Sequence, residues 1–232
     1  MTYAEAVAYL DSCASFGIKP GLERIHALLD ELGHPERAYK TVHVTGTNGK
    51  GSVTVYIDSV LTTSGHRSGR FTSPHLISYT ERIAVNGRNI TEEAFGELIA
   101  KVKDAVAKIE AKGSESPTQF EVLTAAAFLF FMEQQVNYAV IEVGLGGLLD
   151  STNVIFPEVS VITNVSMDHQ AYCGNTLREI ATHKAGIIKP GIPVVTAAQG
   201  EALAVIKDKA KELNSKAYVF NEDFSIQQSH CH

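Results

Sequence analysis

A glycine-rich segment between a strand pattern and a helix pattern constrains the fold of this chain most. Residues 41–45 (TVHVT) are short and β-branched, which is typical of a buried strand. A loop follows at once, and a helical pattern continues from it to near Gly65. In such a turn successive backbone N–H groups approach phosphate oxygens, and the helix N-terminus adds the positive end of its dipole. The segment predicts a site for ATP and Mg²⁺ formed by Thr45, Gly46, Thr47, Asn48, Gly49, Lys50, Gly51 and Ser52.

The loop departs from the strict phosphate-loop pattern. Val44 occupies the first glycine position, and Gly51 stands where Ser or Thr is expected, with Ser52 one place later. The alternative interpretation is an ordinary glycine-rich turn that caps a helix. The strand–loop–helix context favours phosphate binding, in which Lys50 reaches the β- and γ-phosphates and a nearby hydroxyl coordinates Mg²⁺.

Further strand patterns alternate with helix patterns along the rest of the chain. Strands alternating with helices indicate a parallel sheet with helices on both faces. The predicted fold class is therefore α/β, a doubly wound parallel sheet of the phosphate-loop nucleotide-binding type. We expect one ATP-binding domain at residues 1–220 and an irregular tail at residues 221–232. Strands are predicted at residues 41–45, 67–71, 81–85, 138–143, 158–163, 193–196 and 216–220.

Composition excludes several functional classes. A net charge of −6 argues against a nucleic-acid binder, whose surface is basic. The apolar runs are too short to span a bilayer, and the N-terminus lacks a signal-peptide pattern. Cys13, Cys173 and Cys231 show no metal-ligand spacing and cannot all pair in disulfides. The simplest interpretation is a cytoplasmic globular protein that binds neither nucleic acid nor membrane.

Polar side chains accompany the ends of several predicted strands. Ser73, Glu142 and His169 each belong to a different strand pattern, and Ser52 follows the phosphate loop. In an open parallel sheet ligands bind outside the carboxyl ends of the strands, so these groups should meet at one edge. Mg²⁺ takes oxygen ligands and keeps waters, so a few protein ligands suffice. A loop-capping carboxylate and a structural histidine are the alternatives, and only the joint occurrence with the phosphate loop favours a metal site.

The order of these motifs resembles that of a known family. The string from Val44 to Ser52 looks like the phosphate loop of the Mur ligase superfamily, and its ending is similar to the folylpolyglutamate synthase and dihydrofolate synthase branch. Further blocks resemble that branch in order and spacing, over residues 2 to about 198. They are Ser73-Pro74-His75-Leu76 leading to Glu81-Arg82-Ile83, Phe120-Glu121 with Thr124-Ala125-Ala126, Glu142-Val143-Gly144-Leu145-Gly146-Gly147 leading to Asp150-Ser151-Thr152-Asn153, and Asp168-His169-Gln170 leading to His183-Lys184-Ala185-Gly186-Ile187.

The resemblance implies roles for the predicted metal site. Ser73, Glu142 and His169 match Mg²⁺ ligands of the family, and Ser52 matches a serine that contributes to the nucleotide-bound metal. His169 is also implied as a catalytic residue, together with Lys50.

Lys184 is the third catalytic residue that the resemblance implies. The lysine that it matches in the family is carbamylated by CO₂, which turns a cation into an anion beside the metal. That chemistry needs a neutral amine, so burial or nearby cations must lower the lysine pKa. A phosphate contact or a plain ion pair is the alternative role.

Three further residues are implied as substrate contacts. Phe120 lies where the family contacts the pterin, Arg82 would contact an anion, and Asp150 lies in a turn-rich loop that would orient substrate or nucleotide. The alternative for Arg82 is a surface ion pair with Glu81 or Asp150. The family has a basic or polar residue near position 148, whereas residues 148–149 are both leucine here.

The resemblance also implies a reaction. Family members use ATP to activate a side-chain carboxylate of folate, supplied as tetrahydrofolate polyglutamate, as an acyl phosphate. The amine of free glutamate attacks it to give an amide, ADP and phosphate. Positioning and charge neutralisation do most of that work.

The length of the chain departs from the family pattern. Family members continue with a second α/β domain, whose Asp-Gly-Ala-His-Asn type motif is absent here. We therefore expect the ATPase portion of a ligase, with weak nucleotide binding, no useful ligation by these 232 residues alone, and self-association through uncovered apolar surface. The alternatives are a nucleotide-binding remnant or regulatory protein, and an unrelated phosphate-loop NTPase.

Overall fold

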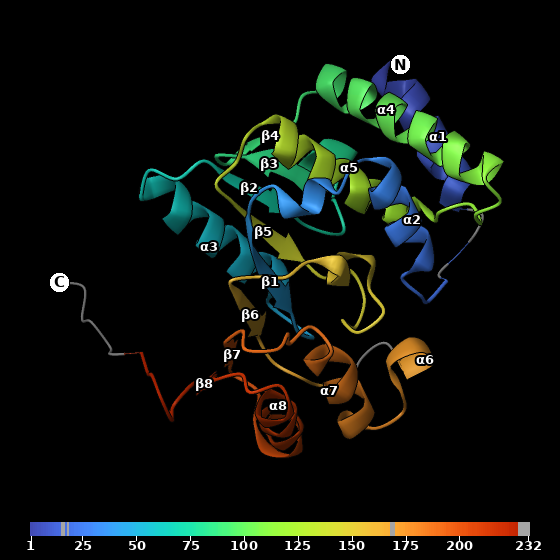
Figure 1. Cartoon of the computed structure of the whole chain (residues 1–232). Coiled ribbons are helices and arrows are strands. Elements are labelled where there is room, and N and C mark those ends of the chain that lie inside the picture. The colour runs from blue at the N-terminus through green and yellow to red at the C-terminus, as the bar shows by residue number, and fades with distance from the viewer. Residues whose placement is uncertain (15–16, 18, 168–169, 227–232) are drawn as a thin grey trace.

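Figure 1 shows a computed structural model of the chain, which describes residues 1–14, 17, 19–167 and 170–226. The described helices are α1 (Tyr3–Ala14), α2 (Glu23–Glu31), η1 (Pro35–Arg37), α3 (Lys50–Thr63), η2 (Tyr79–Arg82), α4 (Glu92–Ala111), α5 (Gln119–Glu133), η3 (Ser151–Val154), α6 (Gln170–Cys173), α7 (Leu177–Ala185) and α8 (Gly200–Glu212). The described strands are β1 (Lys40–Thr45), β2 (Ser68–Phe71), β3 (Ile83–Val85), β4 (Arg88–Asn89), β5 (Tyr138–Glu142), β6 (Val159–Ile162), β7 (Val194–Thr196) and β8 (Ala217–Val219).

The strands form one sheet. Its order, within the described residues, is β4-β3-β2-β5-β1-β6-β7-β8. The pairs from β2 through β5, β1, β6 and β7 to β8 are parallel, whereas β2–β3 and β3–β4 are antiparallel. The predicted α/β class with a parallel sheet is confirmed, and the sheet carries an antiparallel edge in addition. Because β1 lies between β5 and β6, the loop after β1 leaves the sheet at its centre.

Helices cover both faces of the sheet (Figure 1). On one face, α5 packs between the sheet and the layer of α1, α2 and α4, and their side chains form the largest core cluster. A second cluster joins α7 and α8 to β6 and β7. On the other face α3 packs through Val53, Ile57 and Leu61 against valines of β1 and β5. The phosphate-loop helix is thus held by the central strands.

Capping boxes begin α1 and α5. The Thr2 backbone N–H donates to Glu5 Oε2 at 2.7 Å, and Glu5 N–H donates back to Thr2 Oγ1 at 3.3 Å. At α5 the same exchange joins Thr118 and Glu121. In both cases a carboxylate and a hydroxyl satisfy amides that the first helical turn leaves without partners.

The strand predicted at residues 81–85 is shorter in the structure. Its first residues belong to η2, and β3 starts at Ile83. The cause is the Glu81 carboxylate, which accepts backbone N–H groups of Leu76, Ile77 and Ser78 at 2.7–2.9 Å and so closes a turn. Asn86 and Gly87, a residue pair typical of tight hairpin turns, both have positive φ and join β3 to β4.

The described part of the predicted tail begins with a local turn directly after β8. Phe220 and Phe224 form an isolated bridge, and Asp223 Oδ2 accepts the backbone N–H of Val219 at 2.8 Å. The domain boundary at residue 220 stays a prediction.

Gly69 on β2 leaves room for the Phe131 ring of α5. A Cβ at this position would lie 2.7 Å from Phe131 Cδ1, closer than real Cβ contacts. We predict that Gly69→Ala lowers the free energy of unfolding by about 1–3 kcal/mol, because the core must shift to accept the methyl group. Urea unfolding followed by circular dichroism measures the change. Adding Phe131→Leu should offset part of the loss, and strictly additive effects of the two changes would contradict the explanation.

Candidate functional site

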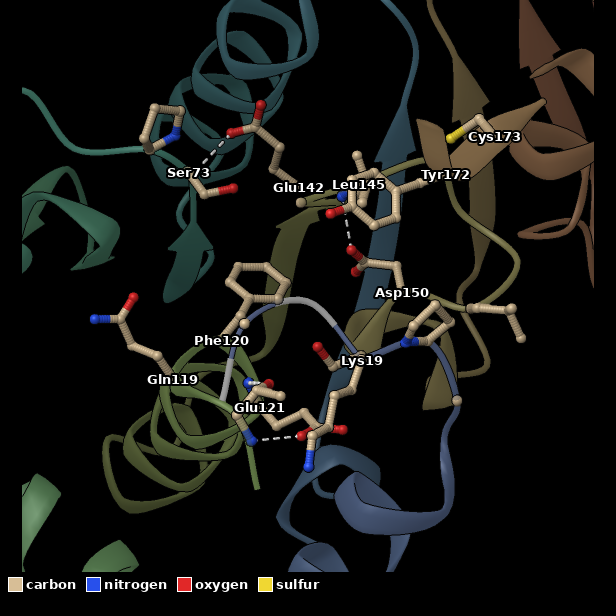
Figure 2. A pocket seen from close by; sticks show the side chains of 18 of the residues that line it. Lys19, Ser73, Gln119, Phe120, Glu121, Glu142, Leu145, Asp150, Tyr172 and Cys173 are labelled. Atoms are coloured by element: carbon tan, nitrogen blue, oxygen red, sulfur yellow. Dashed lines mark hydrogen bonds between the residues drawn. The ribbon is translucent and has the colours of Figure 1, made fainter. Parts of the chain in front are cut away.

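A cavity of about 650 Å³ opens at the carboxyl ends of β2 and β5, beside the start of α3. Figure 2 shows its walls: Ser73 and Glu142 at one end, Phe120 and Glu121 from the start of α5, and Asp150 and Leu145 from the loop after β5. The residues that line it are Ala14, Gly17, Lys19, Pro20, Gly21, Lys50, Ser73, Pro74, Arg82, Thr118, Gln119, Phe120, Glu121, Glu142, Gly144, Leu145, Leu149, Asp150, Ser151, Tyr172, Cys173 and His183.

The loop between β1 and α3 is held by the segment after β6. Gly46 has a φ of 150°, and a Cβ there would lie 1.8 Å from Thr163 Oγ1, so no larger residue fits. The Thr163 hydroxyl donates to the Asn48 carbonyl at 2.7 Å, and Asn48 N–H donates to Asn164 Oδ1 at 2.9 Å. Gly49, at φ 80°, is the N-cap residue directly before α3. This strand–loop–helix arrangement is the one that phosphate binding requires.

Lys50 folds over its own loop. Its Nζ donates to the Gly46 carbonyl at 2.9 Å and to the Thr47 carbonyl at 3.2 Å. The side chain also faces the cavity, while Ser52 is exposed in the first turn of α3. The Thr45 hydroxyl points away from the loop and donates to the Gly146 carbonyl at 2.7 Å, so it fixes the loop after β5.

Glu142 is the buried carboxylate of the site, with 3% of its surface exposed. Burial raises its pKa, although the backbone N–H of Ser73 and the charges of Lys50 and Arg82 act in the opposite direction. Ser73 N–H donates to Glu142 Oε2 at 3.0 Å. A Cβ added at Gly51 would lie 3.6 and 3.7 Å from the two Glu142 oxygens, so the carboxylate directly faces the first turn of α3.

The donor set around Glu142 suits Mg²⁺. Ser73 and Glu142, which are joined by a hydrogen bond, offer hydroxyl and carboxylate oxygens, and hard cations prefer oxygen ligands. Ser52 is exposed in the first turn of α3 and is not among the residues that line the cavity. Among the residues that the structure describes, no cluster of three or more His, Cys, Asp or Glu side chains could hold a metal ion. A cation that relies on a few protein oxygens, waters and phosphate oxygens fits such a site. Asp168 and His169, which belong to the predicted site, lie outside the described residues.

Arg82 is held by aromatic neighbours. Its Nε donates to His75 Nδ1 at 2.8 Å, and its guanidinium lies 5.5 Å from the centre of the Tyr79 ring. Burial lowers its pKa. Glu81, which the sequence offered as an ion-pair partner, is engaged with backbone amides instead. Arg82 therefore presents a cation to the cavity that also contains Glu142.

Phe120 forms an apolar wall of the cavity. Its ring stacks on Phe71 with 5.9 Å between centroids and an angle of 29° between planes. A Cβ added at Gly144 would lie 2.5 Å from Phe120 Cζ, so the glycine allows the ring to reach this position. A planar apolar ligand group would find a matching face here.

Asp150 is buried in the loop after β5, and Figure 2 shows its hydrogen bond with Leu145. Oδ2 accepts Leu145 N–H at 2.8 Å, and Oδ1 accepts both the backbone N–H and the hydroxyl of Thr152. Burial raises the Asp150 pKa, and these hydrogen bonds act against the shift. Since the Thr152 hydroxyl donates to Asp150, it accepts from His43 Nε2 at 2.8 Å. Asp150 thus anchors the loop that lines the cavity.

Arg24 is a site residue that the sequence patterns do not reveal. It is buried in α2, and its Nε donates to Glu121 Oε2 at 3.1 Å. Its Nη2 donates to the carbonyl of Lys19 at 2.6 Å. It therefore joins the Lys19–Gly21 wall of the cavity to the start of α5. Arg24 and Glu121 are 97 residues apart in the sequence. The sequence around Glu121 shows only a capping box, so it gives no sign of this contact.

Lys184 is buried inside α7, with 2% of its surface exposed. The glycine turn after β5 packs directly on this part of the helix. A Cβ at Gly147 would lie 2.8 Å from the His183 carbonyl and 3.3 Å from Lys184 Cα. The neighbouring His183 lines the cavity.

Residues 44–229 match the Mur ligase middle domain. The chain belongs to the Mur ligase family. The resemblance seen in the phosphate loop and in the blocks that follow it is thereby confirmed. Within the described residues of this Mur ligase domain, no helix has the length and apolar character needed to cross a membrane.

Proteins of the folate branch are similar to this domain. A dihydrofolate synthase/folylpolyglutamate synthase of Bacillus subtilis is 44% identical over 230 residues, which cover 95% of this chain and 54% of that protein. A folylpolyglutamate synthase of Lacticaseibacillus casei is 42% identical over 234 residues, covering 100% of this chain and 55% of that protein. A solved FPGS–AMPPCP–folate complex has a TM-score of 0.93 and 42% identity, over 100% of this chain and 57% of that one. The chain thus spans about half the length of the curated relatives it matches.

The buried His43 makes the stability of this Mur ligase domain depend on pH. Burial, aided by the charge of Lys189, lowers the His43 pKa from 6.5 to about 3. Below pH 6.5 the unfolded chain binds a proton that the folded chain excludes. The stabilisation is therefore complete above pH 6.5 and falls by about 1.4 kcal/mol per pH unit as the pH drops toward 3.

Urea unfolding at pH 7, 6 and 5 measures this contribution. Unfolding of a His43→Gln variant should depend less on pH, because the titrating group is gone. The exposed His66 offers a matched control, since His66→Gln should keep the slope of the unmodified protein. An unchanged slope in His43→Gln would assign the pH dependence to other groups.

Proposed function

We propose that this chain is the nucleotide- and folate-binding part of an ATP-dependent carbon–nitrogen ligase that joins glutamate to a carboxylate of folate. The observation that carries the proposal is the convergence of Lys50, Arg82 and the buried Glu142 on one cavity at the carboxyl ends of parallel strands. The cavity offers cations for anionic groups and a carboxylate for a metal. The similarity to an FPGS–AMPPCP–folate complex supports the same pair of ligands here.

The nucleotide is proposed to bind at the loop before α3. Its amides and the dipole of α3 favour phosphate oxygens, and Lys50 adds a charge beside them. Mg²⁺ is proposed to be held by Ser52, Ser73 and Glu142, with His169 as a further ligand. When bound, it would neutralise charge on the phosphates and the reacting carboxylate. A nearby cation would also keep Glu142 ionised, because it opposes the effect of burial on the pKa.

The reaction has two steps. A folate carboxylate oxygen attacks the γ-phosphorus of ATP, and ADP leaves, which gives an acyl phosphate. The amine of glutamate then attacks the acyl carbon, the bond between that carbon and the phosphate oxygen breaks, and phosphate leaves as the amide forms, while the amine nitrogen releases a proton to solvent. The chain would contribute position and charge: Lys50 stabilises the transferring phosphoryl group, and Arg82 offers a cation to the anionic groups.

The folate ring is proposed to bind between the two walls of the cavity. Phe120 presents its ring as an apolar face, while Asp150 holds the opposite loop in place. The pocket is large enough for a fused heterocycle, since ligand pockets of about 300–1,000 Å³ are typical.

Self-association is proposed through exposed aliphatic side chains, of which Leu76 and Ile77 are each 92% exposed.

We predict that Lys50→Ala weakens Mg²⁺-dependent binding of AMPPCP at least about tenfold, because a charge-assisted contact to the phosphates is lost. Isothermal titration calorimetry in the presence and absence of Mg²⁺ measures the affinity. Lys209→Ala in α8 is the matched control, because that lysine pairs with the neighbouring Glu212 of the same helix. Equal affinities of the unmodified and Lys50→Ala proteins, at equal thermal stability, would refute the nucleotide site.

The proposed carbamate on Lys184 has its own test. Lys184 is buried in α7 at the position that matches the family's carbamylated lysine, and it is the neutral form of an amine that reacts with CO₂. We predict a protein-bound carbamate signal in ¹³C NMR with labelled bicarbonate and Mg²⁺ at neutral pH. The signal should disappear in Lys184→Met and persist in Lys189→Met. A spectrum without the signal in the unmodified protein would contradict the carbamate.

A further inference from the structure

Polar side chains meet at the contact between α3 and β2. On α3, Thr54, Asp58 and Thr62 recur every four residues and so lie on one side of the helix. On β2, Ser68 and Arg70 share one face of the strand. Each of these residues has a buried side-chain atom without a hydrogen-bond partner among the described residues: Thr54 Oγ1, Asp58 Oδ1, Thr62 Oγ1, Ser68 Oγ and Arg70 Nε. We call this group the α3–β2 seam.

An ion pair lies in the middle of the seam. Arg70 Nη1 and Asp58 Oδ2 are 3.8 Å apart, and only 15% and 3% of the respective side chains are exposed. The distance is too long for a direct hydrogen bond, so both groups have bonding capacity left. Buried polar groups in folded proteins are satisfied by protein atoms or by ordered water. The seam brings together the hydroxyl oxygens, the free Asp58 oxygen and the Arg70 Nε–H group. Ordered water molecules can form hydrogen bonds with several of these groups at once.

The polar character of the seam is specific to one side of α3. Beside it, Val53, Ile57 and Leu61 of the same helix make an ordinary apolar contact with β1 and β5. Apolar side chains in the seam could therefore attach α3 to β2 equally well, without the cost of burying polar groups. A buried ion pair adds little stability compared with apolar residues, but it disfavours any shift of the helix that separates the two charges.

The seam lies between two elements that carry site residues. Thr54 is one helical turn after Lys50, and Ser73 follows the end of β2. Lys50 and Ser73 both line the cavity, and Ser73 donates its backbone N–H to Glu142. Any sliding of α3 along β2 would change the spacing between Lys50 and Ser73.

We propose that Asp58 and Arg70, bridged by water with the hydroxyls of the seam, are positioning residues that fix the phosphate-loop helix on β2. They set the spacing between Lys50 and the Ser73–Glu142 pair without contacting any ligand. The relevance of this spacing to phosphate binding rests on the proposed function, whereas the fixing of the helix does not.

The test compares removal of one charge with removal of both. Asp58→Leu or Arg70→Met alone leaves a buried charge without its partner, so each should lower the thermal midpoint. The double variant Asp58→Leu/Arg70→Met has an apolar seam and should recover most of that loss. Lys101→Gln/Glu133→Gln removes an exposed ion pair between α4 and α5 and serves as the matched control.

Hydrogen exchange on the double variant separates a positioning role from a purely stabilising one, because a purely stabilising pair would not change local exchange at the phosphate loop once global stability is matched. At conditions of equal global stability, amides of residues 46–52 should exchange about tenfold faster than in the unmodified protein, while those of β5 stay unchanged, because the helix is held less firmly. The dissociation constant for Mg²⁺–AMPPCP should rise about tenfold, since small displacements of positioning groups have large effects. The control pair should change neither quantity.

Unchanged exchange and unchanged nucleotide affinity in the double variant would overturn the proposal. If the unmodified chain binds no nucleotide, the proposed function fails, and the exchange measurement alone decides on the seam. Thr54→Val decides the matter should the double variant not fold. In a hydrated seam this change removes a water contact and speeds exchange at residues 50–52, whereas in a dry seam it leaves exchange unaltered and raises stability, which would contradict the proposal.

Discussion

The place of β1 between β5 and β6 is the constraint on which the site depends. All three strands are parallel, so their carboxyl ends and the loops that follow lie on the same edge of the sheet. The loop after β1 contacts the segment after β6 through Thr163 and Asn164, and Thr45 fixes the loop after β5. A phosphate loop, a buried carboxylate and an apolar wall thereby meet around one cavity, although each comes from a different part of the chain.

Local chemistry explains why much of this could be predicted from the sequence. The run from β1 through Gly46 and Gly49 to Lys50 has both the backbone freedom and the charge that a phosphate loop needs, and the structure places it accordingly. Capping boxes such as the one at Thr118 locate helix starts because hydroxyl and carboxylate partners are only three residues apart. Glu142 was identifiable as the polar end of an apolar strand. These signals are short in sequence and depend little on distant residues.

The remaining features depend on contacts that no local pattern encodes. Arg24 meets Glu121 across 97 residues, and Gly46 is required by Thr163, which lies in the segment after β6. The late start of β3 was missed for a related reason: the Glu81 carboxylate closes a turn with backbone amides, so the strand begins later than its apolar pattern indicates. The antiparallel pairing of β3 with β2 and β4 was not predicted either. Asp150 illustrates a third case, because its neighbours take both oxygens and make it an anchor of the cavity wall.

The hydrogen bonds of Lys50 have a consequence for which anions the loop can hold. Its ammonium group already interacts with two carbonyl oxygens of the loop that it serves. An anion that binds Lys50 must therefore replace these two neutral carbonyl acceptors. The binding free energy gained is the difference between the interaction of the ammonium group with the anion and its interaction with the carbonyls. That difference is small for an anion of low charge and grows with the charge density of the phosphate chain. A loop with these internal hydrogen bonds stays ordered around its own lysine and, if it holds anions as proposed, would favour highly charged polyphosphates.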